Sequence, residues 1–316
     1  MPSTFEDLSR RTVNCINLTE PKPEFVLQIF SMSSPRRSDL PYAHYIDITM
    51  AMAKRAWPAW APFESDSDFQ AWMELEGLAY RQAERVFTFS QATRCSVIKD
   101  YGVPENRVVA VGAAGHFDEV PQQERTYGSH VIVFNGSDFK RKGGDRVLRA
   151  FELVQRRFPD SALIIVANSA IKESPRIHVF GKVTRERLFA TFEAADVVLA
   201  PTRLDVLPGF VMEAMSRGVV PILSDAESMN ELVTDGLDGY VVSPPTPELL
   251  AERICGLFEN PTLLPRMGSA ARERVRACWN WNAVARSMTA ALANRPFLDF
   301  SNATLPHHAD RYSCSR

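Results

Sequence analysis

The second half of the chain alternates short apolar segments with segments of helical spacing, and this pattern constrains the fold most strongly. The apolar segments predict strands at residues 130–135, 162–167, 177–180, 196–200, 219–223 and 239–242. Helices are predicted at residues 144–157, 185–194, 209–217, 247–258 and 261–277, with a short one near 227–233. Apolar strands that alternate with helices indicate a parallel sheet covered on both faces. Ligands of such sheets bind beyond the carboxyl ends of the strands, where the loops at 136–144 and 201–209 lie.

The first part of the chain repeats this pattern less regularly. Strands are predicted at residues 25–30, 42–48 and 86–90, and helices at residues 69–83 and 91–101. A chain of 316 residues is long enough for about two domains. We therefore predict an α/β protein with two Rossmann-like domains that contain parallel sheets. Residues 1–125 form the first domain with a linker at 111–128, residues 126–294 form the second, and residues 295–316 form a loosely ordered tail.

Charge and composition exclude several classes of protein. The 36 basic and 38 acidic residues give a net charge of −2, so no general nucleic-acid-binding surface is expected. No apolar run reaches the roughly 18 residues of a membrane span, and the N-terminus lacks the apolar core of a signal peptide. We expect a cytoplasmic protein and leave a peripheral membrane contact open. No C-x-x-C pair occurs, and no metal site is predicted.

A basic loop follows the strand at 130–135 and opens the next helix. It contains Lys140, Arg141 and Lys142 beside Gly143 and Gly144. Glycine lets a ligand approach the backbone, a helix start favours anions, and lysine adds a positive charge. The loop is either a diphosphate site or a solvated basic turn. It is not a Walker loop, because the spacing G-x-x-x-x-G-K-[ST] is absent.

The segment at residues 201–225 carries two acids, Asp205 and Glu213, on either side of Pro208 and Gly209. Glu213 stands in an apolar run, so its carboxylate is expected to be paired or to face a cleft. The alternative is that both acids lie on the surface. Together with the basic loop, the pair suits a sugar joined to a nucleotide. An acid in the loop can bind sugar hydroxyls, the free N–H groups of a helix start can bind phosphate, and an acid on the helix can bind a ribose.

These motifs resemble those of a known family. From Val131 to Leu292 the chain is similar to the C-terminal domain of a family 4, GT-B, retaining glycosyltransferase. The E-x7-E motif of that family is matched by Asp205-x7-Glu213, and its phosphate loop by Lys142–Gly143. Further matches are at residues 194–197, Ser224–Asp225, 231–233 and 235–239. Residues 40–115 resemble the later part of the family's N-terminal domain more loosely.

The resemblance implies a role for each matched residue. Lys142 would neutralise the donor diphosphate, Glu213 would bind the donor ribose, and Asp205 would contact the transferred sugar. Asp205 and Lys142 are thus the expected catalytic residues. The expected donor-binding residues are Ser137, Lys140, Arg141, Lys142, Gly143, Asp205, Gly209, Phe210, Val211 and Glu213. Of these, Gly209, Phe210 and Val211 would bind the donor through their backbone N–H groups.

The implied reaction moves a sugar from a UDP- or GDP-linked donor to an acceptor hydroxyl with retained configuration. Cationic side chains and the helix dipole would stabilise the leaving diphosphate. No cofactor and no metal would be needed besides the nucleotide-sugar. The acceptor would be a carbohydrate, a lipid or a small molecule.

The chain also departs from the family pattern. Ser137 stands where the family carries arginine, so Lys140 or Arg141 would have to supply that charge. Pro208 removes a backbone N–H. No strand with a glycine loop precedes Phe25, so the resemblance implies a shortened, incomplete N-terminal domain. These departures leave a non-catalytic alternative, a remnant that binds nucleotide or nucleotide-sugar or acts as a partner subunit.

Three residues are candidates for the acceptor side: His44, Asp47 and His116. Strand alternation places His44 and Asp47 on opposite faces, and a structural role for His44 is the favoured interpretation. His116 lies in the linker, where an interdomain cleft is expected, or is simply a surface residue. The family fold also predicts that a late helix, residues 281–292, crosses back to the N-terminal domain.

Overall fold

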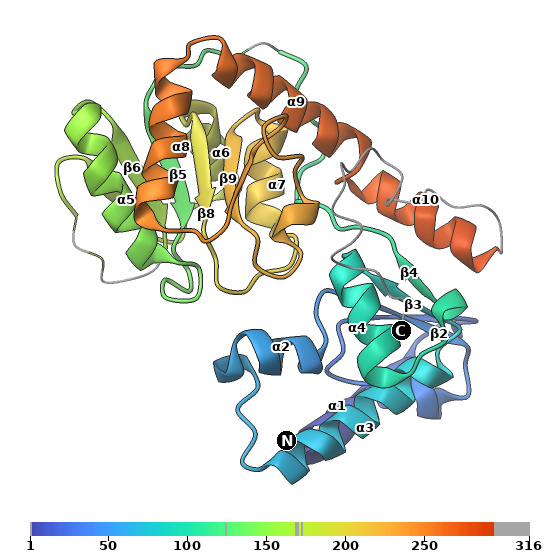
Figure 1. Cartoon of the computed structure of the whole chain (residues 1–316). Coiled ribbons are helices and arrows are strands. Elements are labelled where there is room, and N and C mark those ends of the chain that lie inside the picture. The colour runs from blue at the N-terminus through green and yellow to red at the C-terminus, as the bar shows by residue number, and fades with distance from the viewer. Residues whose placement is uncertain (1, 124, 168–170, 172, 294–316) are drawn as a thin grey trace. The chain divides into compact units, whose positions relative to one another are not determined.

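The computed structural model describes residues 2–123, 125–167, 171 and 173–293 of the chain. These residues form two compact units (Figure 1). Of these residues, the N-terminal unit contains 2–112 together with 284–293, and the C-terminal unit contains those of Ala113–Ala283.

The C-terminal unit is built on a six-stranded parallel sheet in the order β10-β9-β8-β5-β6-β7. The strands are β5 (Val131–Asn135), β6 (Ala162–Val166), β7 (Ile177–Phe180), β8 (Val197–Ala200), β9 (Val220–Ser224) and β10 (Tyr240–Val242). Numbered from β5, the order is 3-2-1-4-5-6, which is the Rossmann order. The connections change direction between β5 and β8, so ligand binding is expected where these two neighbouring strands end.

Helices cover both faces of this sheet (Figure 1). They are α5 (Gly144–Arg157), α6 (Arg185–Ala194), α7 (Gly209–Ser216), α8 (Pro247–Glu259) and α9 (Leu263–Ala277), with a 3-10 turn η4 at Met229–Glu231. α5 packs against α8, whereas α7 packs against α6 and α9. In α5, Val147, Phe151 and Val154 share one buried face at helical spacing. This face fixes the helix that follows the basic loop.

The N-terminal unit contains a four-stranded parallel sheet in the order β1-β2-β3-β4. Its strands are β1 (Val26–Ile29), β2 (Tyr42–Ile46), β3 (Arg85–Thr88) and β4 (Val108–Ala110). Its helices are α1 (Pro2–Leu18), α2 (Met50–Ala56), α3 (Asp66–Gln82), α4 (Gln91–Tyr101) and α10 (Trp281–Leu292), with 3-10 turns η1 (Arg36–Ser38), η2 (Pro58–Trp60) and η3 (Glu105–Arg107).

The two faces of this second sheet are covered from different parts of the chain. Residues of α3 and α4 pack on one face, including Tyr80 and Val97. On the other face, Val284 and Ala291 of α10 pack with Tyr45. The predicted return of the late helix to the N-terminal unit is therefore confirmed.

Most predicted elements are present, and three helices (residues 91–101, 144–157 and 185–194) have the predicted bounds. α1 and α2 were not predicted. α1 is held by Phe5, whose ring packs edge-on against Trp72 at 5.3 Å, while most of its described side chains are at least partly exposed.

The units also differ from the predicted division at residues 125 and 126. The predicted linker belongs largely to the C-terminal unit, which begins at Ala113. Arg125 donates a hydrogen bond to the carbonyl of Arg217 (2.9 Å), and the Tyr127 hydroxyl donates to that of Gly218 (3.0 Å). These contacts bind the segment to the end of α7, and turn residues alone could not reveal them. The predicted tail at 295–316 lies outside the described residues.

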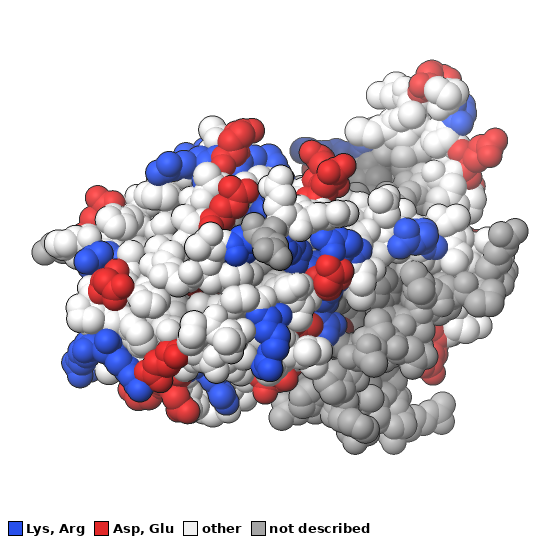
Figure 2. All heavy atoms as spheres, turned by 90° about the horizontal axis from the view of Figure 1, so that it is seen from above, with Lys and Arg blue, Asp and Glu red and all other residues white. Residues whose placement is uncertain are grey.

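Surface charge is mixed rather than separated by sign. On the face shown in Figure 2, basic and acidic side chains of the described residues are interspersed. No helix in the described part of the chain is long and apolar enough to cross a membrane. Within the same residues, no group of three or more His, Cys, Asp or Glu side chains is placed to hold a metal ion.

A buried carboxyl lies in the core of the N-terminal unit. Glu76 of α3 is fully buried. It accepts hydrogen bonds from the hydroxyls of Tyr80 (2.8 Å) and Tyr101 (2.5 Å). Burial raises the pKa of Glu76 to about 7, because desolvation of the charged form outweighs these hydrogen bonds.

This pKa predicts that the N-terminal unit loses stability as the pH rises. A raised folded-state pKa gives stability that is complete below the unfolded pKa and is lost as the pH passes through about 7. A difference of about 2.5 pKa units corresponds to roughly 3 kcal/mol. Glu76→Gln should remove most of this dependence, measured by hydrogen exchange of α3 at pH 5 and pH 8 after correction for intrinsic rates. An equal pH dependence in wild type and variant would contradict the prediction.

Candidate functional site

The site lies where β5 and β8 end, and two loops form it. The basic loop is residues 136–144, and the acidic loop is residues 201–208. The Arg203 N–H donates to the carbonyl of Arg141 (2.8 Å), and the Thr202 hydroxyl donates to the same carbonyl (3.2 Å). The two loops are therefore joined through their backbones.

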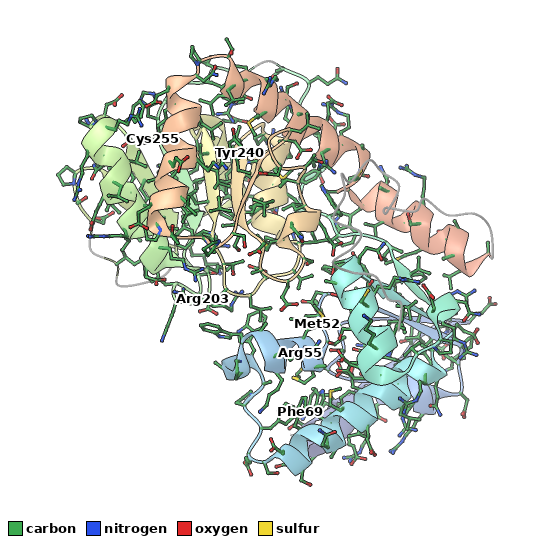
Figure 3. All side chains as sticks on the ribbon, in the orientation of Figure 1. Met52, Arg55, Phe69, Arg203, Tyr240 and Cys255 are labelled. Carbon is green, nitrogen blue, oxygen red and sulfur yellow. The ribbon has the colours of Figure 1, made fainter. Side chains whose placement is uncertain are left out.

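A side-chain clamp strengthens this junction. The guanidinium of Arg203, labelled in Figure 3, forms two parallel hydrogen bonds with the carboxylate of Asp145 in the first turn of α5, at 2.9 and 2.7 Å. Arg146 donates to the carbonyl of Pro201 (3.1 Å). Bidentate arginine–carboxylate pairs fix geometry as well as adding energy. The start of α5 and the acidic loop are held as one body.

Gly143 is required by the approach of the two loops. Its φ is +78°, in the left-handed region that favours glycine. A Cβ at this position would lie 2.2 Å from the carbonyl oxygen of Pro201. Both the backbone conformation and the space exclude a side chain here. The glycine predicted at the phosphate loop thus lets the acidic loop pack against it.

The two residues expected to be catalytic are brought together. Lys142 Nζ lies 3.1 Å from Asp205 Oδ2. Both line a pocket that is open to solvent, and its wall also includes Phe210 and Val211 of α7. Asp205 Oδ1 accepts the N–H of Val206 (3.1 Å), which orients the carboxylate.

Glu213 lies on the second turn of α7, and its side chain is only 8% exposed. Its Oε1 accepts the backbone N–H of His116 (3.0 Å) and lies 3.5 Å from Nδ1 of the same residue. The guanidinium of Arg185, at the start of α6, lies 4.0 Å away. Burial raises the pKa of the Glu213 carboxyl, and the His116 N–H and Arg185 oppose this shift. The expectation that this acid is paired is confirmed.

The start of α7 presents backbone N–H groups. Those of Gly209 and Phe210 make no hydrogen bond to the described part of the chain. The N–H of Val211, in contrast, donates to the carbonyl of Pro208 (3.0 Å). Of the three N–H groups that are expected to bind the donor, the one of Val211 already has a partner within the first turn of the helix.

The other three residues of the basic loop that are expected to bind the donor differ in their exposure to solvent. Ser137 is exposed, and its N–H donates to Asn135 Oδ1 (3.0 Å). Lys140 is exposed. Arg141 is 5% exposed, so its guanidinium does not offer the surface cation that would replace the arginine missing at Ser137.

The three acceptor-side candidates have different surroundings. His44 is fully buried, with its ring edge-on to Tyr42 and Tyr80, and burial lowers its pKa to about 4. This supports the structural interpretation of His44. Asp47 follows β2, where its Oδ1 accepts the N–H of Ile48 (2.8 Å). His116 lies beside Glu213, an expected donor-binding residue, and its backbone N–H donates to that carboxylate (3.0 Å).

Sequence reasoning missed Arg203, Asp145 and Arg185. Only the position of Arg203, two residues before Asp205, could have pointed to it from the sequence. Its partner Asp145 is 58 residues away, and Arg185 reaches Glu213 from a different helix. Such pairs depend on the strand order, which no local pattern encodes.

Comparisons with known proteins place the chain in a family. The model of the family described as "Glycosyl transferases group 1" matches residues 117–274, half of the chain. A GDP-mannose-dependent monoacylated alpha-(1-6)-phosphatidylinositol monomannoside mannosyltransferase of Corynebacterium glutamicum is 28% identical over 61% of this chain and 52% of its own. A phosphatidyl-myo-inositol mannosyltransferase of Mycobacterium tuberculosis is 29% identical over 56% and 49%. The matched regions span about half the length of these relatives.

Solved structures share the fold. A sucrose-phosphate synthase of Thermosynechococcus elongatus has a TM-score of 0.71 at 15% identity, covering 92% of this chain and 79% of its own. The Anabaena protein HepE, solved with UDP and glucose, has a TM-score of 0.69 at 15% identity, covering 91% and 81%. The predicted α/β fold of the GT-B class, with Rossmann-like units, is confirmed.

The close approach at Gly143 yields a prediction about stability. Gly143→Ala should destabilise the C-terminal unit by about 2–4 kcal/mol, because it adds backbone strain and a clash with Pro201. Gly256→Ala in α8 is the matched control, since its Cβ would meet open space. The control should be neutral or stabilising by up to about 1 kcal/mol. Urea unfolding measures both, and equal midpoints for the two variants would refute the packing argument.

Proposed function

Because the chain belongs to the glycosyl transferases group 1 family, we propose that it moves a sugar from a nucleotide-diphosphate sugar to an acceptor hydroxyl. The reaction proceeds with retained configuration and without a bound metal. The observation that carries the proposal is the pairing of Lys142 with Asp205 in a pocket that the first turn of α7 also lines, with Glu213 on the second turn of the same helix.

Each of these side chains suits one part of the donor. The Glu213 carboxylate is buried and oriented by the His116 N–H, and its oxygens can accept hydrogen bonds from the two hydroxyls of a ribose. Asp205 accepts hydrogen bonds from hydroxyls of the transferred sugar. The N–H groups of Gly209 and Phe210 face the same site from the start of α7 and suit an anion.

Lys142 acts on the leaving group. Its ammonium pairs with Asp205 (3.1 Å) and turns to the diphosphate when the donor binds. A lysine cation and a helix start then stabilise the negative charge that develops as the bond from sugar to phosphate breaks. The acceptor hydroxyl attacks the same face of the sugar and loses its proton to the departing phosphate oxygen.

The names of the relatives suggest the first substrates to test. One relative is named for GDP-mannose, and both are named for phosphatidylinositol-based acceptors. HepE, which shares the fold, was solved with UDP. We propose a GDP- or UDP-linked hexose as donor, with GDP-mannose first. The acceptor is a carbohydrate, a lipid or a small molecule reached from the cytoplasm.

Substitution of the two donor residues tests the assignment. Glu213→Ala should weaken donor binding about 100-fold, because two hydrogen bonds to a charged acceptor, each worth roughly 1.5 kcal/mol, are lost. Lys142→Ala should weaken it at least about 10-fold through loss of a charge-assisted contact. Calorimetry with GDP-mannose and UDP-glucose, together with a transfer assay, measures both effects.

Matched controls are Glu252→Ala and Arg266→Ala, exposed residues of α8 and α9, which should leave binding and transfer unchanged. Wild-type affinity and turnover in both site variants would overturn the assignment. Donor binding by the wild type without transfer or donor hydrolysis would instead favour the non-catalytic alternative.

The chemistry itself is tested by metal removal and product analysis. Transfer should continue at an undiminished rate in excess EDTA, because Lys142 and the start of α7 supply the charge that a metal would otherwise supply. The anomeric proton of the product, observed by NMR before mutarotation, should show the donor's configuration. Loss of activity that Mg²⁺ or Mn²⁺ restores would refute metal independence, and an inverted product would refute retention.

A further inference from the structure

The side chain of Arg141 is more deeply buried than those of Lys142, Arg203 and Arg185. Its side chain is 6% exposed, against 14% for Lys142. The guanidinium donates through Nε to Asp138 Oδ2 (2.7 Å) and through Nη1 to the carbonyl of Leu204. The same Nη1 lies 3.5 Å from Asp205 Oδ2.

These contacts position Asp205 through both backbone and side chain. The carbonyl of Leu204 belongs to the peptide bond that leads into Asp205, so the hydrogen bond from Arg141 fixes the backbone there. The backbone carbonyl of Arg141 also accepts hydrogen bonds from two groups of the acidic loop, the Thr202 hydroxyl and the Arg203 N–H. No other residue of the basic loop has this many hydrogen bonds to the acidic loop among the described contacts.

Asp205 has two cationic partners, of which Arg141 is fixed and Lys142 can move. Asp205 Oδ2 lies near two cations, Lys142 and Arg141. The lysine ammonium stands on a flexible four-carbon chain, whereas the guanidinium is a rigid fork already bound on two sides. If Lys142 leaves to bind a diphosphate, Asp205 would lack a counter-charge in a site where it is 18% exposed, unless Arg141 keeps it.

We propose that Arg141 is a positioning residue that holds Asp205 toward the transferred sugar when Lys142 turns to the diphosphate. Arg141 acts through Asp205 and does not contact phosphate. The inference rests on the proposed function, and it assigns the extra cation of the basic loop to sugar recognition and turnover rather than to nucleotide binding.

The two roles differ in what they do to the bare nucleotide. GDP and UDP contain the diphosphate and ribose but no transferred sugar. A residue that contacts phosphate contributes equally to the affinity for GDP and for GDP-mannose. A residue that acts through Asp205 contributes only when the sugar is present.

The test compares Arg141→Met and Arg141→Lys with the wild type. Calorimetry measures binding of GDP, UDP, GDP-mannose and UDP-glucose, and a transfer assay gives kcat and KM. We expect Arg141→Met to keep nucleoside diphosphate affinity within about threefold, while nucleotide-sugar affinity and kcat fall at least about tenfold, two contacts being lost. Arg141→Lys, which keeps the charge, should recover part of kcat.

A double-mutant cycle with Asp205→Asn isolates the coupling. If Arg141 acts through Asp205, Arg141→Lys should change kcat by less than about twofold in the Asp205→Asn background. Arg141→Lys keeps the charge on a slightly shorter side chain, so this arm stands even if Arg141→Met does not fold, which its thermal midpoint would reveal. Additive effects on kcat, or a loss of GDP affinity that parallels the loss for GDP-mannose, would overturn the inference.

Failure of the proposed function has a different signature. A wild-type chain that binds neither the nucleoside diphosphates nor the nucleotide-sugars would overturn the proposed function and this inference with it. A wild type that binds both kinds of ligand, with Arg141 variants that lose both equally, would overturn the inference alone.

Discussion

The junction between the basic and acidic loops is the contact on which the rest of the site depends. Gly143 lets the carbonyl of Pro201 approach, and the ion pair of Arg203 with Asp145 links the acidic loop to the start of α5. Lys142 and Asp205 are neighbours only because these loops are joined, although 63 positions separate them in sequence. A lysine and an aspartate on separate mobile loops would need to be ordered at each binding event, at a cost in conformational entropy. Here the fold has ordered them beforehand.

Strand order explains why this junction stands at the right place. The connections of the six-stranded sheet change direction between β5 and β8, and ligands of such sheets bind where two strands of this kind end. α7 follows the acidic loop and carries Glu213 on its second turn. Its burial, which raises its pKa, is tolerated because the His116 N–H and Arg185 stabilise the charged form. The same contacts hold the carboxylate in one orientation.

The N-terminal unit is built by different means. Its sheet receives α3 and α4 on one face, but α10 must come from the far end of the sequence to cover the other. Its core contains ionisable groups, the Glu76 carboxyl and the His44 ring, both fully buried. Burial raises the pKa of the Glu76 carboxyl and lowers that of the His44 ring, because in each case it disfavours the charged form. The full burial of the His44 ring supports its structural interpretation.

The sequence by itself determined the alternation of strands and helices, the two acids with their basic loop, and the family to which the chain belongs. Those features are local, because each periodic pattern or short motif is formed by residues that are close in sequence. The tertiary structure alone decided which cation pairs with which acid. Arg141 appears in sequence as one more surface cation, yet it is buried beneath the acidic loop. His116 appears as a linker residue, yet its N–H binds Glu213 across 97 positions. Strand order and side-chain burial decide such contacts, and both arise only when the whole sheet has formed.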